Sequence, residues 1–256
     1  DLDDAEGSFE VDRWFLGAGV TYGWSPRDSI GLSVGAGRNS YEFDEVSGEA
    51  PWDEIDESRI SLTWRHGFGD TGSLIVIPTV RSNGEDGASS SDSRSYGLLA
   101  AAFWRVSDNL NIGPGVGVFS RLEDSTRVFP ILAIDWDISE RWNLSTGSGL
   151  AASQGPGLTL SYALNPNWSF GLSGRYEDIE FRLDDEGPAP GGIGRDQSLP
   201  LVLSARLDPN PNVNLSLFMG VELGGQLTLM DESGGVVEES DYDPAALFGV
   251  TANFRF

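Results

Sequence analysis

The sequence predicts an all-β chain folded as a transmembrane antiparallel up-and-down β-barrel of roughly 12–14 strands. Apolar residues recur with a period of two along the whole chain, and turn residues separate the stretches. The other face of these stretches is mostly Gly, Ser, Asn and Thr with isolated charges, and lysine is absent. A soluble sheet normally exposes a face rich in Lys, Glu and Thr, so the apolar face is expected to meet lipid. A large soluble barrel or sandwich is the alternative.

Composition narrows the classes of function. The net charge of −24 argues against nucleic acid as a partner, because phosphate backbones need basic patches. Cysteine is absent, so disulfides and thiol chemistry are excluded. The sequence has no apolar run of about 18 residues, as a transmembrane helix would need, and no signal peptide, so an exported protein would be present here in its mature form. We expect no cofactor.

Thirteen strands follow one another without a linker or an internal repeat, so residues 1–256 are interpreted as one barrel domain with an acidic N-terminal segment at 1–11. A change of apolar parity near Glu177 and Asp178 predicts a β-bulge in the tenth strand. The predicted strands cover 12–24, 29–44, 58–68, 73–81, 93–106, 110–121, 126–139, 142–152, 158–164, 168–183, 198–207, 213–230 and 242–256.

The connections sort into two kinds. Those at 25–28, 69–72, 107–109, 139–141, 165–167 and 208–212 are short and fall on one side of the predicted barrel. Those at 45–57, 83–93, 122–125, 153–157, 184–197 and 231–241 fall on the other side, and four of the six are long. This asymmetry is typical of outer-membrane barrels, whose strand number is even. Either an N-terminal strand is missing, which gives fourteen, or one predicted strand is false, which gives twelve.

The last strand, 242–256, is apolar on one face without a break and ends on an aromatic residue. In water this apolar face would need a partner sheet to cover it. In a bilayer, the lipid covers it. The stretch resembles the C-terminal assembly signal of bacterial outer-membrane β-barrels. The residues that carry this resemblance are Phe248, Val250, Ala252, Phe254 and Phe256.

The whole chain resembles the broad group of small bacterial outer-membrane β-barrel proteins, in its Gly-aromatic strands, short Asp/Asn/Pro turns and terminal Phe. The resemblance implies a location in the bacterial outer membrane, porin-like architecture and insertion by the barrel assembly machinery. It implies no substrate.

Aromatic residues mark the strand ends, as a girdle at a membrane interface requires. His66, the one histidine, shares its face with apolar residues, so we expect an interfacial and non-catalytic role. The expected interface residues are Trp14, Trp64, His66, Trp104, Trp136, Trp142 and Trp168.

The inward face carries charges that line a lumen and set the selectivity of a pore, or that pair into a network that closes it. Inward glycines favour some open space, strand curvature or room for a plug from 1–11. The expected lumen-lining residues are Arg65, Arg81, Arg105, Arg121, Arg127, Asp135, Asp137, Arg175, Glu177, Arg206, Glu222 and Arg255.

The acidic loops lack the spacing of a dedicated calcium site, so we interpret them as a solvated surface and expect no metal. Two functions fit the sequence. The first is a passive pore or diffusion channel for small solutes. The second is a structural or surface-interaction barrel, whose loops bind a partner protein, lipopolysaccharide or copies of the same chain. An enzyme is not expected.

Overall fold

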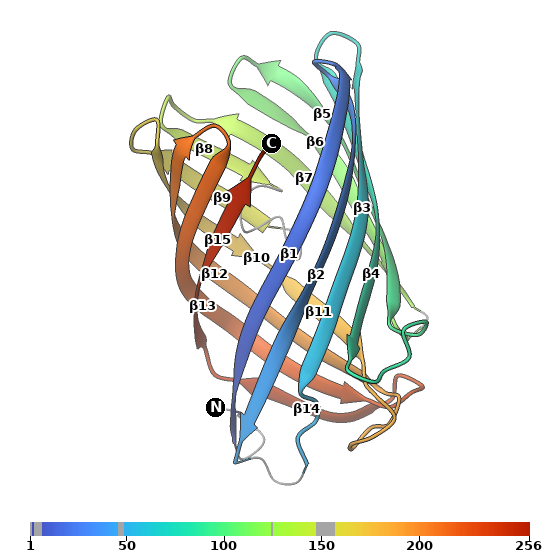
Figure 1. Ribbon diagram of the computed structural model, residues 1–256. Coiled ribbons are helices and arrows are strands. Elements are labelled where there is room, and N and C mark those ends of the chain that lie inside the picture. Colours follow the sequence, from blue (N-terminus) through green and yellow to red (C-terminus); the bar gives the residue numbers. More distant parts are fainter. Residues whose placement is uncertain (1, 3–6, 46–48, 124, 147–156) are drawn as a thin grey trace.

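The computed structural model describes residues 2, 7–45, 49–123, 125–146 and 157–256, and all of its regular structure is strand. Fifteen strand segments form one sheet, and its ladders are antiparallel apart from one parallel contact (Figure 1). No helix in the described part of the chain is long and apolar enough to cross a membrane. The outer part of the predicted strand 142–152 and the turn at 154–156 lie outside the described residues.

The first nine segments follow the predicted order. They are β1 (Ser8–Ser25), β2 (Asp28–Asp44), β3 (Glu54–Phe68), β4 (Gly72–Glu85), β5 (Arg94–Ser107), β6 (Leu110–Ser120), β7 (Thr126–Asp137), β8 (Trp142–Thr146) and β9 (Gly157–Ala163). The remaining six are β10 (Trp168–Arg175), β11 (Glu177–Arg182), β12 (Ile193–Asn210), β13 (Val213–Met230), β14 (Val236–Tyr242) and β15 (Ala245–Phe254).

Two of the strands are interrupted. Both β10 and β11 pair with β12, and both β14 and β15 pair with β13. The fifteen described segments therefore occupy thirteen places around the barrel, within the predicted range. The break at Tyr176 lies where the apolar parity predicted an irregularity.

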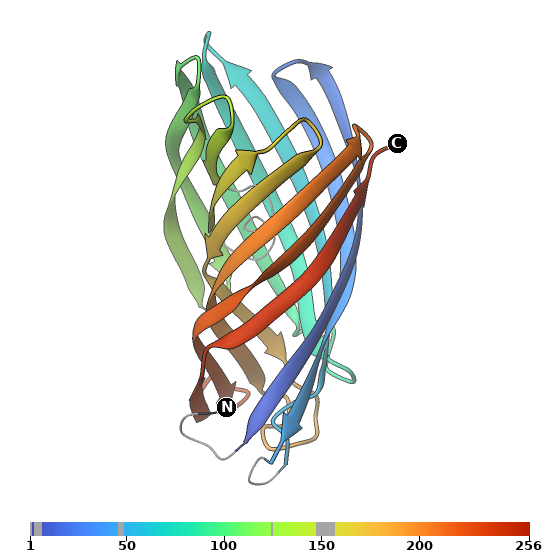
Figure 2. The ribbon, with the colours of Figure 1, turned by 90° about the vertical axis from the view of Figure 1, so that its left-hand side faces the viewer.

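The first and last places of the barrel, β1 and β15, run in the same direction and face each other across a seam (Figure 2). Among the described residues no ladder joins them, and their Cα traces stay more than 8 Å apart along nearly all of their length. A bridge between Leu2 and Tyr242 joins the two sides at the loop end alone. The prediction that a further strand completes an even number stays a prediction.

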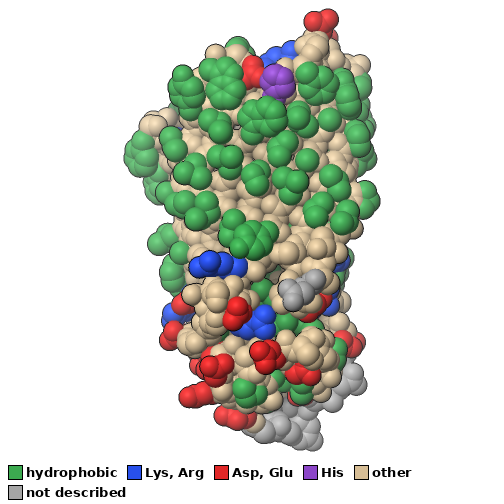
Figure 3. Space-filling model, turned by 90° about the vertical axis from the view of Figure 1, so that its right-hand side faces the viewer, with side chains coloured by type: hydrophobic (Ala, Val, Ile, Leu, Met, Phe, Trp, Pro, Cys, Tyr) green, Lys and Arg blue, Asp and Glu red, His purple; other side chains and the backbone are tan. Residues whose placement is uncertain are grey.

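The apolar face of the strands points outward and forms a belt. Ile60, Val80 and Tyr96 are 55%, 40% and 58% exposed, although burial in protein is the usual state of such side chains. The belt covers the short-turn end and the middle of the molecule, while acidic side chains gather at the loop end (Figure 3). Such an apolar outward surface is suited to contact with lipid hydrocarbon rather than with water. The barrel is therefore a transmembrane barrel.

The predicted strand bounds are wrong at the loop end, because the strands extend further there than the sequence analysis expected. Residues 231–241 contain β14 rather than a continuous loop, β12 begins at Ile193 rather than at 198, and β3 begins at Glu54 rather than at 58. These segments are polar on one face and carry few consecutive apolar residues, so their periodicity is weak. They are extended because they complete a second, smaller ring.

The smaller ring, called the outer ring here, is built from the loop ends of β1–β4 and of β11–β14. Arg182 of β11 pairs with Gly84 of β4, and the Leu2–Tyr242 bridge closes the opposite side. Its interior is a packed apolar core of Tyr41, Trp52, Ile55, Ile179, Phe181, Leu183, Ala189, Leu227, Leu229 and Tyr242. Phe181 is completely buried, and its ring lies 5.0 Å from the ring of Trp52. The loop half of the barrel is therefore filled on this side.

Candidate functional site

The lumen is wet at the short-turn end. The inward side chains of this end are exposed to water although they lie inside the barrel, and the predicted lumen residues among them are Arg65, Arg105, Asp135, Asp137, Arg206 and Arg255. Asn143 donates hydrogen bonds to Asp135 at 2.9 Å and to Asp137 at 3.0 Å, and Arg206 pairs with Asp208 at 2.9 Å. This mouth therefore carries both signs of charge in contact with solvent.

The other predicted lumen residues lie deeper, and most of them are packed; the exception is Arg127, whose side chain is 40% exposed. Glu177 has a side chain only 3% exposed, so it does not line open water. Arg175 and Glu222 contribute to the same buried group, while Arg121 follows β6 at the outer rim and Arg127 lies on the loop end of β7. The predicted lumen-lining residues thus fall into two groups: one group lies at the wet mouth, and the other lies in the charged outer half of the barrel.

The first packed group, called the floor cluster, consists of Arg13, Arg175, Glu177, Asp196 and Glu222. Arg13 reaches Asp196 and Glu222 at 3.2 Å each, and Glu177 at 3.7 Å. The Tyr41 hydroxyl donates to Asp196 at 3.0 Å, and the Tyr242 hydroxyl lies 3.2 Å from the other oxygen of the same carboxylate. Since both tyrosines belong to the apolar core, this cluster seals the side of the outer ring that faces the lumen.

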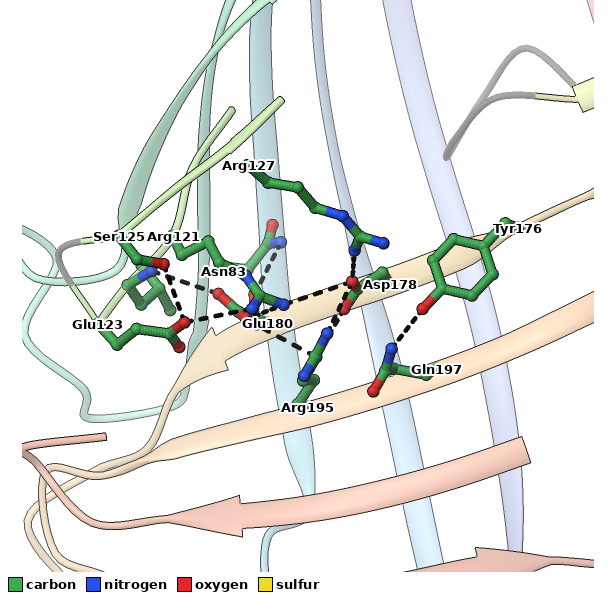
Figure 4. A network of polar contacts seen from close by, with 11 residues as sticks. Asn83, Arg121, Glu123, Ser125, Arg127, Tyr176, Asp178, Glu180, Arg195 and Gln197 are labelled. Carbon is green, nitrogen blue, oxygen red and sulfur yellow. Dashed lines mark hydrogen bonds and ion pairs between the residues drawn. The ribbon is translucent and has the colours of Figure 1, made fainter. Parts of the chain in front are cut away.

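The second group, called the partition cluster, consists of Arg121, Arg127, Asp178, Glu180 and Arg195 (Figure 4). Asp178 receives bonds from Arg195 at 2.7 and 2.9 Å, from Arg121 at 3.4 Å and from Arg127. Arg121 also pairs with Glu180 at 2.9 Å. One carboxylate is therefore shared by three guanidinium groups that come from both sides of the barrel.

β11 is able to present this cluster because it has protein on both faces. Residues alternate across a strand, so Ile179 and Phe181 enter the apolar core while Asp178 and Glu180 point the other way, toward β6 and β7. The backbone oxygen of Glu180 also accepts a bond from Asn83 at 3.2 Å. β11 thus divides the outer half into a filled compartment and a charged one.

The partition cluster adjoins a cavity of about 580 Å³ at the outer surface. Arg121 belongs to both, and Arg94, Arg182, Asp92 and Glu232 line the cavity further out. On its rim, hydrogen bonds from the Ser233 hydroxyl and from the N–H groups of Gly235 and Ser233 hold the pKa of Asp231 below its usual value. The cavity and the cluster share Arg121, and Arg127 of the cluster lies on β7, the strand that also carries Asp135 and Asp137 of the wet mouth.

Arg182 holds the loops around this cavity together. Its side chain donates to the backbone oxygens of Gly191 at 3.0 Å, Leu122 at 3.2 Å and Asp92 at 3.3 Å. Each oxygen belongs to a different loop. Arg27 has the same role at the opposite end, where it bonds to the backbone oxygens of the turn at 68–72.

Aromatic rings lie across several inward glycines. A Cβ atom on Gly35 would meet the Phe15 ring at 2.3 Å, and one on Gly97 would meet the Phe119 ring at 2.4 Å. The expectation that inward glycine leaves open space is therefore wrong at these positions, because a ring from the neighbouring strand occupies the place of the missing side chain.

The predicted interface residues lie on the outward face. Trp64, Trp104, Trp136, Trp142 and Trp168 are 37–42% exposed and lie near the short turns, whereas Trp14 lies toward the loop end of β1 and is 54% exposed. His66 stacks on Trp64, and its Nδ1 lies 2.7 Å from Asp28. The predicted assembly-signal residues on β15 also face outward; Phe248, Val250 and Phe254 are 86%, 73% and 59% exposed.

Sequence reasoning missed Arg13, Asp178, Glu180, Arg195 and Asp196. Arg13 has the inward parity of β1, so its face could have been predicted. Asp178 and Glu180 lie directly after the predicted bulge, where the parity of the strand is reset. In the described part of the chain no group of acids and histidine is arranged to hold a metal ion.

No protein-family model and no curated protein sequence matches the chain. Among solved structures, the NanC porin in a rhombohedral crystal form is similar with a TM-score of 0.40 and 9% identity, over 100% of both chains. A mutant of the ferric enterobactin receptor PfeA from Pseudomonas aeruginosa is similar with a TM-score of 0.26 and 11% identity, over 97% of this chain and 62% of the receptor. Similarity at this level carries no argument about function.

Proposed function

We propose that this chain is an outer-membrane diffusion channel for small solutes, in which the partition cluster forms the narrow part. The apolar belt and the acidic loop end support this location, with the loops on the outer surface. One observation carries the channel proposal. Arg121 lines the outer cavity and also belongs to the charge cluster on the inner side of the barrel wall. Opposed fixed charges at a narrow point are what sets selectivity in a pore.

The barrel is proposed to be non-enzymatic. Ser25 bonds to Asp28 rather than to His66, and His66 belongs to the outward face beside Trp64. A Ser–His pair for nucleophilic catalysis requires the hydroxyl within hydrogen-bond reach of the imidazole.

Conductance of the purified chain in planar bilayers tests the channel. Arg127 is 40% exposed in its side chain and pairs with Asp178. The substitution Arg127→Ala shortens the narrow part of the channel and leaves Asp178 with one cation fewer. We therefore expect the conductance to rise about twofold and the ion selectivity to move toward cations. The matched control is Arg38→Ala, because Arg38 pairs with Asp56 at 2.6 Å on the outward face.

The second candidate is a closed barrel that presents its acidic loop end to a protein partner, lipopolysaccharide or another copy. The filled outer ring favours it. If both the wild-type chain and the Arg127→Ala variant insert into bilayers but produce no conductance steps, the channel proposal is rejected and this candidate is left.

A further inference from the structure

The outer cavity has a lining that carries both signs of charge and many hydroxyl groups. Three arginines and four acids are among its described lining residues, together with six serine and threonine residues. Because the opposed charges are nearly equal in number, the cavity favours neither a cation nor an anion. A neutral solute that is rich in hydrogen-bond donors and acceptors suits this lining better.

Two of the three arginines are already bound to protein groups. Arg182 donates to the backbone oxygens of three loops, and Arg121 pairs with carboxylates of the partition cluster. The third, Arg94, and the acids Asp185 and Glu232 are exposed and form no hydrogen bond or ion pair in the part of the chain that the structure describes. A guanidinium and a carboxylate can each bind two neighbouring hydroxyl groups, such as those on adjacent carbons of a sugar ring.

The hydroxyl groups of the lining are held by hydrogen bonds that leave acceptor sites free. Ser91 donates to Asp92 at 3.2 Å, and its oxygen lies 3.0 Å from the Ser89 hydroxyl. Ser125 donates to Glu123 at 3.1 Å (Figure 4). A hydroxyl that donates its hydrogen keeps lone pairs that can accept. These oxygens can therefore accept from the hydroxyl groups of a solute while their contacts within the protein are kept.

The cavity is preformed and has the volume of a small-molecule site. Its volume of about 580 Å³ lies within the range of about 300–1,000 Å³ that is usual for ligand pockets. Arg182 ties the loops around it together, so little order has to be gained on binding. Leu122 and Leu183 of the lining offer apolar contact to the C–H groups of a sugar ring.

We propose that the outer cavity binds a neutral saccharide, whose hydroxyl groups bond to Arg94, Asp185 and Glu232 and to the serine hydroxyls of the lining. A charged solute would meet like charge on part of this lining, whereas a saccharide has donors and acceptors for both signs. Arg121 belongs to the cavity and to the partition cluster, so a bound saccharide lies at the outer entrance of the proposed narrow part. This inference rests on the proposed channel and makes neutral sugars its solutes.

Calorimetric titration of the full chain, in a detergent without a sugar headgroup, tests the site with glucose and maltose as separate probes. We expect at least one of them to bind the wild type and to bind Arg94→Ala about tenfold more weakly, because charge-assisted hydrogen bonds to the sugar are lost. Ser91→Trp should bind neither sugar, since the indole occupies the cavity. The matched control is Arg38→Ala, which should bind as the wild type does, because Arg38 pairs with Asp56 and does not line the cavity.

Absence of binding to the wild type overturns the site, and so does equal binding to the wild type and to folded Arg94→Ala and Ser91→Trp variants. Glycine and lipopolysaccharide are titrated in parallel. Tighter binding of glycine would assign the cavity to a zwitterion, and binding of lipopolysaccharide alone would assign it to the sugar of a lipid; either result overturns the proposal.

Bilayer recordings on the same preparations keep the saccharide site and the channel apart. Binding without conductance rejects the channel and keeps the saccharide site, whereas conductance without binding rejects only the site.

Discussion

At the scale of single residues, three environments of arginine shape the inside and the ends of this barrel. Those of the two clusters pair with carboxylates, Arg27 and Arg182 bond to backbone oxygens, and Arg81 lies over the Phe119 ring with no acceptor for its buried Nε among the described residues. Guanidinium suits all three because it carries five donors on a plane and remains charged. The absence of lysine is consistent with this use, since the planar guanidinium spreads its donors over a wider area than an ammonium group does.

Arg182 offers a prediction at this scale. Arg182→Ala removes donors from three carbonyl oxygens that lie in three loops, so we expect a loss of about 2–3 kcal/mol, because bonds to charged groups contribute about 1.5–3 kcal/mol and the freed oxygens recover some water. The loss should appear as faster amide hydrogen exchange in loops 86–93 and 183–192. Arg94→Ala is the control, as Arg94 lines the same cavity without a bond in the described residues. Unchanged exchange in Arg182→Ala would contradict the assigned role.

The inward parity of Arg65, Arg105 and Arg255 could be read from the sequence because each alternates with apolar residues in a regular strand. The partners of Arg13 and Arg121 could not be predicted. Asp196 and Asp178 lie 183 and 57 residues away, on strands whose outer parts have weak periodicity. Periodicity gives the face of a residue, but the closure of the barrel decides which residues meet across it.

At the scale of elements, β11 is the segment that makes the loop end different from an open barrel. It leaves the wall after Tyr176, pairs with β12 and touches β4. One signal for this was present in the sequence: Tyr41, Phe43 and Trp52 are aromatic residues in a region otherwise rich in acids, and Tyr41 and Phe43 occupy the inward parity of β2. An inward aromatic set requires a covering element, but the sequence does not say which strand provides it.

Phe181→Ala tests the core of the outer ring. The ring is completely buried and packs on Trp52, so we expect a loss of about 3–5 kcal/mol in the free energy of unfolding, because transfer and cavity terms add. Phe170→Ala on the lipid face is the control. Lipid fills the space there, so only the transfer term of about 2 kcal/mol is lost. Urea unfolding from lipid vesicles measures both, and equal losses would show that the core is not tightly packed.

At the scale of the whole molecule, thirteen places in an alternating antiparallel sheet put β1 and β15 in the same direction across the seam. Their facing edges carry backbone groups that lipid cannot satisfy, at a cost of several kcal/mol for each unpaired group in hydrocarbon. An additional antiparallel strand would run against both edges, as the even-number expectation requires. The apolar outward face alone could not predict the seam, because it is equally regular on β1 and on β15.

Cysteine cross-linking measures the width of the seam, and the natural chain helps because it contains no cysteine. A disulfide needs Cα atoms within about 7 Å, whereas β1 and β15 stay more than 8 Å apart along nearly all of their length. The pair Ala18→Cys with Val250→Cys should therefore resist direct oxidation. Ala18→Cys with Val34→Cys, which are register partners on β1 and β2, should oxidise readily. Rapid disulfide formation across the seam would mean that β1 and β15 meet in the membrane, and the barrel would then close with a parallel pair.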